Sequence, residues 1–395
     1  MRKWVILLIA ILSITALAYA EITVWSSENQ IPALEKIAAD FESDYGIKVN
    51  IQQVNFGDIK STFLTAAPAG EGPDVIVGAH DWVGELAING LLEPIPYLPQ
   101  KDEYFPVALD AFSYGGKLYG VPYTTEALAI IYNKDLIEEE PTTMSELLGM
   151  ATDIADDEIV GFVYNVGDFY FSYPFISGDG GYIFKDTPEG QDVYDIGLNN
   201  EGAVAGGKLI KSFLDDGIMP QGANYNLADS LFKDSLAGFI INGIWATPEY
   251  RNVGIDYAIL PFNKITLDSG NNPKPFVGVQ GFMVNAKSKN KLEALEFVVN
   301  YIGSFDGQKA MFEGERRGTA REDLFNVIKT NAGPELYDVL MFSESASIGT
   351  PMPNVPEMAP VWGAMADALG LIINDQDTVQ NALDSAVDKI LAQIE

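Results

Sequence analysis

Short apolar segments that favour β-strands alternate with longer segments of helical periodicity, and this alternation constrains the fold more than any other feature. Residues 22–25 are β-branched and aromatic, and the apolar residues that follow recur at helical spacing until Gly46. The pattern continues in strands and helices at residues 48–54, 58–66, 74–77 and 81–88. Alternation of this kind predicts an α/β fold with buried parallel strands.

The alternation resumes in the second part of the chain, which has the pattern of another α/β lobe. The expected elements lie at residues 142–154, 161–164, 201–214, 237–241, 257–260, 278–286, 291–302, 362–373 and 379–394. Asp377 and Gln380 have the spacing of a capping box at the start of the last helix. A length of 395 residues predicts two or three domains. Since no low-complexity linker separates the lobes, we expect direct chain crossings that form a hinge.

The charge balance argues against polyanionic partners. Lys and Arg number 24 against 56 Asp and Glu, which gives a formal net charge of -32. DNA, RNA and acidic membrane surfaces would be repelled by such a protein. A hydrophobic fraction of 47% is typical of a globular chain. We therefore expect a globular protein that binds no nucleic acid.

Cysteine and histidine usage removes several kinds of site. The chain has no cysteine and one histidine, His80. Disulfides, thiolate metal sites and cysteine nucleophiles are therefore excluded. His80 with Asp81 could form a metal or acid–base pair, but a histidine that bonds to the backbone fits a lone residue of this type better. The sequence predicts no metal site and no cofactor.

The first twenty residues have the pattern of a secretory signal. Arg2 and Lys3 precede an apolar run at 5–17, and small residues flank Tyr19 at positions 18 and 20. The expected cleavage follows Ala20, with an uncleaved N-terminal anchor as the alternative. Without cysteine, the chain cannot carry a thioether-linked lipid. The mature protein is expected in the periplasm.

Three loops that follow expected strands mix hydrogen-bond acceptors, amides and aromatic rings. In open α/β sheets, ligands usually bind where strands end. Carboxylates accept hydroxyl hydrogens and flat rings cover apolar C–H faces, so this mixture suits a neutral polyol. The loops span residues 26–30, 78–82 and 165–171, and their candidate ligand-binding residues are Ser27, Glu28, Asn29, Gln30, Asp81, Trp82, Asp168, Tyr170 and Phe171.

Each of these residues also has a structural interpretation. Asp81 and Asp168 could cap helices or face solvent, and residues 169–171 could be helix core. Trp245 and Trp362 could likewise be core residues. Carboxylate pairs also occur in glycosidases, but Asp81, Glu126 and Asp168 show no hydrolase motif. An exported glycosidase, a binder of non-carbohydrate ligands and a structural surface protein remain as alternatives.

Six collinear segments resemble the maltose/maltodextrin-binding proteins of ABC sugar importers, over essentially the whole mature chain. They lie at residues 72–81, 131–136, 178–185, 241–246, 274–279 and 352–362, and include GPDVI, IYNKDL, GDGGY, INGIWA, KPFVGV and MPNVP. The resemblance implies a two-lobed class II periplasmic-binding fold with a ligand cleft and three hinge crossings. It also implies a monomeric, non-enzymatic protein that captures maltose, maltotriose or longer maltodextrins and delivers them to a membrane permease.

The same resemblance assigns roles and lobes. It implies that Asp81, Glu126 and Asp168 bind hydroxyls, that Tyr170 and Phe171 are aromatic contacts, and that Trp245 and Trp362 are stacking platforms. The implied lobes are residues 21–125 with 280–330, and 126–279 with 331–395. The hinge crossings are then expected near Glu126, Gly278 and Thr330.

Some positions depart from the family pattern. Gly78 stands in place of a tryptophan and Trp82 in place of an arginine, which suggests an aromatic ring displaced four residues along the chain. Neutral Asn29 and Gln30 replace an acidic–basic pair. Beyond Trp362, Gly363 and Ala366 occupy the positions of a tyrosine and an arginine. These departures leave open the number and register of the bound sugar units.

Overall fold

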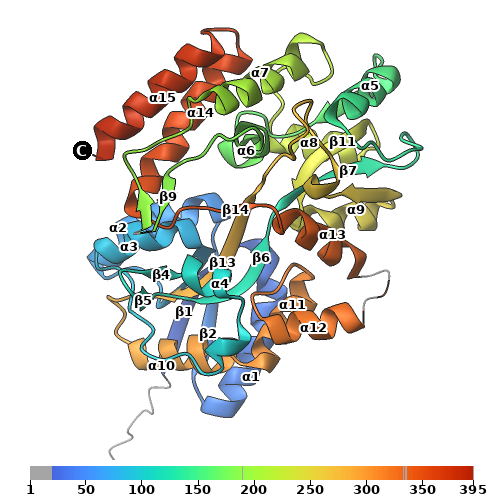
Figure 1. Ribbon diagram of the computed structural model, residues 1–395. Coiled ribbons are helices and arrows are strands. Elements are labelled where there is room, and N and C mark those ends of the chain that lie inside the picture. Colours follow the sequence, from blue (N-terminus) through green and yellow to red (C-terminus); the bar gives the residue numbers. More distant parts are fainter. Residues whose placement is uncertain (1–19, 189, 332, 334–335, 395) are drawn as a thin grey trace, which may run out of the picture.

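The computed structural model describes residues 20–394 except 189, 332, 334 and 335. The expected signal segment therefore lies outside the described residues, apart from Ala20. The described chain has a mixed α/β architecture, in which two larger sheets are flanked by helices (Figure 1). No helix in this part of the chain is long and apolar enough to cross a membrane. The α/β class predicted from the sequence is confirmed.

The first sheet has the strand order β14-β13-β3-β1-β2, and β6 also pairs with β13. Its strands are β1 (Glu21–Ser26), β2 (Lys48–Gln53), β3 (Val75–Ala79), β6 (Val121–Glu126), β13 (Phe276–Val284) and β14 (Thr350–Pro351). Strand β1 runs parallel to β2 and β3, as predicted. Strand β13, whose direction the sequence left open, runs antiparallel to β3 and β6, so the sheet is mixed.

Six helices accompany this sheet among the described residues. They are α1 (Ile31–Tyr45), α2 (Phe56–Ala69), α3 (Val83–Ile88), α4 (Pro106–Ala111), α10 (Lys291–Leu295) and α11 (Phe305–Glu315). Helix α1 buries Leu34, Ile37 and Phe41 and ends at Gly46, which has a φ of 68°. Glycine has no Cβ atom, so this left-handed backbone conformation costs little free energy. Helix α10 continues as the π-helix η6 (Glu296–Ile302).

The second sheet has the order β12-β7-β11-β8 and is again mixed. Its strands are β7 (Leu128–Asn133), β8 (Val160–Val163), β11 (Ala237–Gly243) and β12 (Tyr257–Leu260). Strand β7 pairs antiparallel with β11 and β12, whereas β8 and β11 are parallel. Two small hairpins also occur, β4 (Ser113–Tyr114) with β5 (Lys117–Leu118) and β9 (Lys185–Thr187) with β10 (Gly190–Asp192).

Most of the remaining helices gather around this second sheet, in the upper part of Figure 1. They are α5 (Met144–Ile154), α6 (Phe169–Gly178), α7 (Glu201–Asp215), α8 (Tyr225–Lys233), α9 (Thr247–Val253), α12 (Glu322–Thr330), α13 (Tyr337–Ala346), α14 (Ala359–Ile373) and α15 (Val379–Ile394). The predicted cap of α15 is wrong by one residue. The Thr378 hydroxyl, rather than Asp377, accepts the N–H of Asn381 at 3.2 Å.

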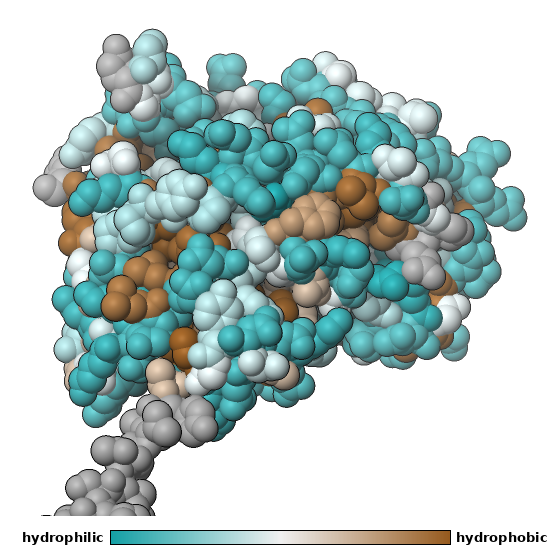
Figure 2. All heavy atoms as spheres, turned by 90° about the horizontal axis from the view of Figure 1, so that it is seen from below, coloured by the Kyte–Doolittle hydropathy of each residue, from teal (hydrophilic) through white to brown (hydrophobic). Residues whose placement is uncertain are grey.

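Each larger sheet has its own hydrophobic core. One core takes its buried side chains from residues 22–123 and 279–320. The other takes them from residues 128–276 and 324–390. On the face shown in Figure 2, hydrophilic residues predominate and apolar residues form small separate groups. Most of the large apolar side chains are buried in the two cores, and few lie on this face.

Candidate functional site

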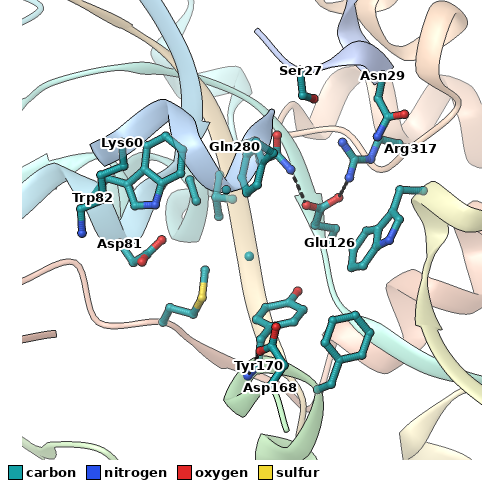
Figure 3. Close-up of a pocket in the computed structure, with 18 of the residues that line it drawn as sticks. Ser27, Asn29, Lys60, Asp81, Trp82, Glu126, Asp168, Tyr170, Gln280 and Arg317 are labelled. Atoms are coloured by element: carbon teal, nitrogen blue, oxygen red, sulfur yellow. Dashed lines mark hydrogen bonds and ion pairs between the residues drawn. The ribbon is translucent and has the colours of Figure 1, made fainter. Parts of the chain in front are cut away.

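A cavity of about 500 Å³ lies where side chains from both cores meet. This volume is within the range of about 300–1,000 Å³ that is usual for small-molecule sites. Strand ends and the first turns of helices supply most of its walls (Figure 3). Its lining residues are Ser27, Asn29, Gln30, Phe56, Gly57, Lys60, Ala79, Asp81, Trp82, Glu126, Asp168, Tyr170, Phe171, Tyr225, Trp245, Gly278, Val279, Gln280, Arg317, Met352 and Trp362.

All of the candidate ligand-binding residues line this cavity except Glu28. Glu28 is exposed in the short 3-10 helix η1 (Glu28–Gln30), where its carboxylate accepts a long hydrogen bond from Gln53 at 3.5 Å. Gln30, two residues later, is buried and donates from Nε2 to the Tyr123 hydroxyl at 3.1 Å. Residues of one short loop thus have different surroundings, since Glu28 is exposed and Gln30 is buried.

Asp81 lies in the 3-10 helix η2 (His80–Trp82), directly after β3. Its Oδ2 accepts the indole N–H of Trp362, from the first turn of α14, at 3.1 Å. Burial raises the pKa of the Asp81 carboxyl, and nearby His80 and Lys60 oppose this shift. Ala79 and Trp82 are the residues that precede η2 and α3, so Asp81 caps neither helix. The carboxylate instead joins residues of the two cores beside the cavity.

His80 is not among the residues that line the cavity, and both of its ring nitrogens bond to the backbone. Its Nδ1 accepts the Val279 N–H at 3.1 Å, and its Nε2 donates to the Met352 carbonyl at 2.9 Å. Burial lowers the pKa of His80, which favours the neutral ring that this bonding pattern requires. The prediction of a backbone-bonded histidine is confirmed. Across the described ranges, no cluster of three or more His, Cys, Asp or Glu residues could hold a metal ion.

Asp168 is both a helix cap and a residue of the cavity wall. It lines the cavity, and its Oδ1 also accepts the N–H of Tyr170 at 2.8 Å as the N-cap of α6. Burial raises the pKa of this carboxyl, and the backbone hydrogen bonds partly offset the effect. The aromatic run that follows divides by residue, because Phe169 is buried in the core while Tyr170 and Phe171 reach the cavity.

Glu126 is held by a buried ion-pair network. Arg317 Nη2 lies 2.9 Å from Glu126 Oε2, and Gln280 Nε2 donates to Glu126 Oε1 at 2.7 Å (Figure 3). The same guanidinium contacts Glu315 Oε2 through Nη1 at 3.2 Å. The Tyr123 hydroxyl donates to that Glu315 oxygen at 3.4 Å. Two buried carboxylates therefore share one cation.

Sharing one cation leaves Glu315 poorly compensated. Its Oε1 is buried with no hydrogen-bond partner among the described residues. The pKa of Glu315 is raised to about 7, because burial raises it by more than the nearby Arg317 charge lowers it. The Arg317 guanidinium also lies 5.6 Å from the centroid of the Trp245 ring. Arg317 therefore interacts both with carboxylates and with an aromatic ring of the protein.

The aromatic rearrangement suggested by Gly78 and Trp82 has a direct structural cause. The Trp82 ring folds back over Gly78 and occupies the space that a side chain at position 78 would need. The indole thus reaches the cavity from a point four residues later in the chain. Gly243 and Trp245 repeat this arrangement at the other sheet, where the Trp245 ring also fills the place of a Cβ atom.

Several lining residues were missed by the sequence analysis. Gln280 and Arg317 both contact Glu126, although each lies more than 150 residues after it in the sequence. No local sequence pattern predicts a contact over such a distance. Lys60 pairs with Glu85 at 2.6 Å. Both cations of the cavity wall are therefore already paired with carboxylates. The cavity thus presents acceptors and rings, which suits uncharged hydroxyl donors better than an anion.

The chain belongs to a family of bacterial extracellular solute-binding proteins, whose model matches residues 36–336. A galactooligosaccharide-binding protein of Bacillus subtilis is 31% identical over 386 residues, covering 95% of this chain and 90% of that protein. A maltotriose-binding protein of Pyrococcus abyssi is 29% identical, covering 80% and 69%. A maltooligosaccharide ABC transporter solute-binding lipoprotein of Streptococcus pneumoniae is 26% identical, covering 94% and 88%.

We expect Glu315 to make stability fall as pH rises towards neutrality. Its pKa is about 7 in the folded protein, against an ordinary value of 4.5. Between these values the folded state binds more protons than the unfolded state, so the free energy of unfolding decreases with pH. Glu315→Gln should therefore stabilise the protein by on the order of 2 kcal/mol at pH 8, with little effect at pH 4. Urea unfolding across this pH range measures the difference.

Glu313→Gln is the matched control, because Glu313 is exposed in the same helix, α11. It should leave the pH profile of the wild type unchanged. A Glu315→Gln profile that runs parallel to that of the wild type would show that this carboxyl does not titrate in the expected window.

Proposed function

We propose that this protein captures a neutral oligosaccharide, an α-1,4-glucan of two or more units, and delivers it to the permease of an ABC importer. The observation that carries this proposal is a cavity with carboxylate acceptors and aromatic rings at both ends and with both of its cations already paired. Hydroxyl hydrogens would bind Asp81 and Asp168, and ring faces would stack on Trp245 and Trp362.

The names of the relatives support an oligosaccharide but differ over its kind. The proteins of Pyrococcus abyssi and Streptococcus pneumoniae are named for maltotriose and maltooligosaccharide. The Bacillus subtilis protein, at 31% identity, is named for galactooligosaccharide. A galactooligosaccharide is therefore the second candidate ligand. The linkage and the ring stereochemistry distinguish these ligands, while both offer neutral hydroxyls and apolar C–H faces.

We propose that the two cores are the interiors of two lobes that close on the ligand. The change of core between Tyr123 and Leu128, and again between Phe276 and Val279, supports crossings close to those expected. Leu324 packs in the second core, which favours a third crossing ahead of Thr330. Residues 21–125 with 280–320, and 126–279 with 324–395, would then form the lobes.

The arrangement of the carboxylates favours binding over hydrolysis. Glu126 is held by Arg317 and Gln280, while Asp168 is bonded to the first turn of α6. A glycosidase needs one carboxyl free to donate a proton and another free to attack or activate water. We propose a monomeric, non-enzymatic, exported protein, with its signal removed after Ala20. The family's extracellular description agrees with export.

We expect titration calorimetry to show that maltotriose and maltotetraose bind at about micromolar Kd, or roughly -8 kcal/mol. Glucose should bind far more weakly, because one ring cannot contact both ends of the cavity. Galactobiose and galactotriose belong in the same series. Tighter binding of the galactose series would favour the second candidate, and the failure of every sugar would refute the proposed function.

A parallel incubation with maltodextrin tests the enzymatic alternative. The concentration of reducing ends should stay constant over hours at a protein concentration that saturates binding. Its steady increase would indicate a glycosidase and contradict the assignment as a binding protein.

We expect Asp81→Ala and Asp168→Ala each to weaken oligosaccharide binding by about 2 to 4 kcal/mol, because each removes a charged acceptor from the cavity wall. Only Asp168→Ala should also lower stability, by about 1 kcal/mol, since Asp168 caps α6. Calorimetry and thermal unfolding separate these two effects.

Asp168→Ser provides the matched variant, because serine is also a good N-cap but carries no charge. It should retain most of the stability while losing affinity. Unchanged affinity in Asp168→Ser, together with lower stability in Asp168→Ala, would reduce Asp168 to a purely structural residue.

We expect the radius of gyration to decrease when the wild type is saturated with maltotriose. A ligand shifts an equilibrium between open and closed forms by its differential affinity for them. An oligosaccharide that touches Asp81 on one lobe and Trp245 on the other favours the closed form. Small-angle scattering with and without sugar measures the change. An unchanged radius alongside confirmed tight binding would contradict closure.

A further inference from the structure

An exposed aromatic ring stands at one end of the cavity. Phe56 is the first residue of α2, and this residue is 36% exposed although it lines the cavity. Helix α2 is anchored in the first core by Ile59, Phe63 and Ala67. Phe56 continues the same helical stripe by one turn, beyond the point where the core ends. The rigid part of the helix thus holds an apolar ring over the cavity.

Two further side chains join Phe56 at this end. The rings of Phe56 and Trp82 lie 5.3 Å apart with an interplanar angle of 37°. Trp82 is only 7% exposed and is held in place because its ring covers Gly78. Lys60 is four residues after Phe56, on the neighbouring turn of α2, and its ammonium lies 2.6 Å from Glu85. The three side chains form a wall of two rings and one fixed cation.

This wall is separate from the buried network at Glu126. Figure 3 places Lys60, Asp81 and Trp82 on one side of the cavity, and Glu126, Asn29 and Arg317 on the other. Each side has its own carboxylate and its own aromatic rings. Phe56 is the aromatic lining residue with the greatest exposure.

We propose that Phe56, Lys60 and Trp82 form a subsite for an additional sugar ring and thereby determine the length of the oligosaccharide that binds best. This proposal rests on the proposed function, and it assigns roles to Phe56 and Lys60 that the family resemblance does not supply. A sugar ring stacked on Phe56 removes its exposed face from water. The Lys60 ammonium has three N–H donors, so its bond to Glu85 leaves donors for a sugar hydroxyl.

The test compares affinities for two-, three- and four-unit oligosaccharides of whichever series the wild type binds. We expect the wild type to bind the longer chains more tightly than the disaccharide. Phe56→Ala should weaken binding of the longest chain about tenfold and leave that of the disaccharide within about twofold. Lys60→Met should act in the same direction, because it keeps the aliphatic stem and removes the donors.

Tyr194→Ala is the matched control, since Tyr194 is an aromatic residue that is 61% exposed and does not line the cavity. It should leave all affinities unchanged. Phe56→Leu keeps an apolar side chain at the helix start, so it should fold like the wild type and still lose the preference for longer chains. Thermal unfolding of each variant confirms that the comparison is made on folded protein.

Two results would overturn the subsite while leaving the proposed function intact. One is a wild type that binds oligosaccharides with no dependence on length. The other is a Phe56→Leu variant with the length preference of the wild type, or with equal losses for short and long chains. A wild type that binds no oligosaccharide would instead refute the proposed function, and the subsite with it.

Discussion

The buried contact between Glu126 and Arg317 is the interaction on which the site depends. Glu126 ends β6, two residues before β7 begins in the other sheet. Arg317 lies near the place where buried side chains change from one core to the other, and Gln280 belongs to β13, which serves both cores. The contact therefore joins the segments that connect the two interiors. Breaking such a pair typically costs about 3 to 5 kcal/mol, because one charge remains buried and uncompensated.

The same network governs what the cavity can bind. Because Arg317 is held by Glu126 and Glu315, and Lys60 by Glu85, the nearby cations are already compensated. A bound anion would have to compete with carboxylates that cannot move away easily. A neutral ligand needs no such exchange, and its hydroxyls gain from acceptors in surroundings of low polarity. For the proposed ligand, the carboxylates of the cavity wall would act as acceptors and its aromatic rings would provide the apolar contacts.

Much of the fold could be predicted from local patterns, and the errors have physical causes. Strand β12 and helix α15 were predicted with the bounds that the structure has, because apolar periodicity is a property of neighbouring residues. The direction of β13 was not predictable, since antiparallel and parallel partners leave similar apolar runs. Glu28, a candidate from the first loop, does not line the cavity, because loop composition does not determine which side chains turn inward. The cap of α15 differs by one residue because Asp377 and Thr378 are both good capping residues.

By itself, the sequence determined the α/β class and the loops at which polar and aromatic residues gather, because strands, helices and the residues that end them are encoded over short stretches of chain. It also predicted Asp81, Asp168 and Trp362 as candidate ligand-binding residues, and all three line the cavity. Tertiary structure alone decided that Trp362 bonds to Asp81, that Arg317 reaches Glu126, and that Phe56 and Lys60 stand beside Trp82. These contacts arise from the packing of elements far apart in sequence. Their partners are selected by geometry and burial, which no local pattern records.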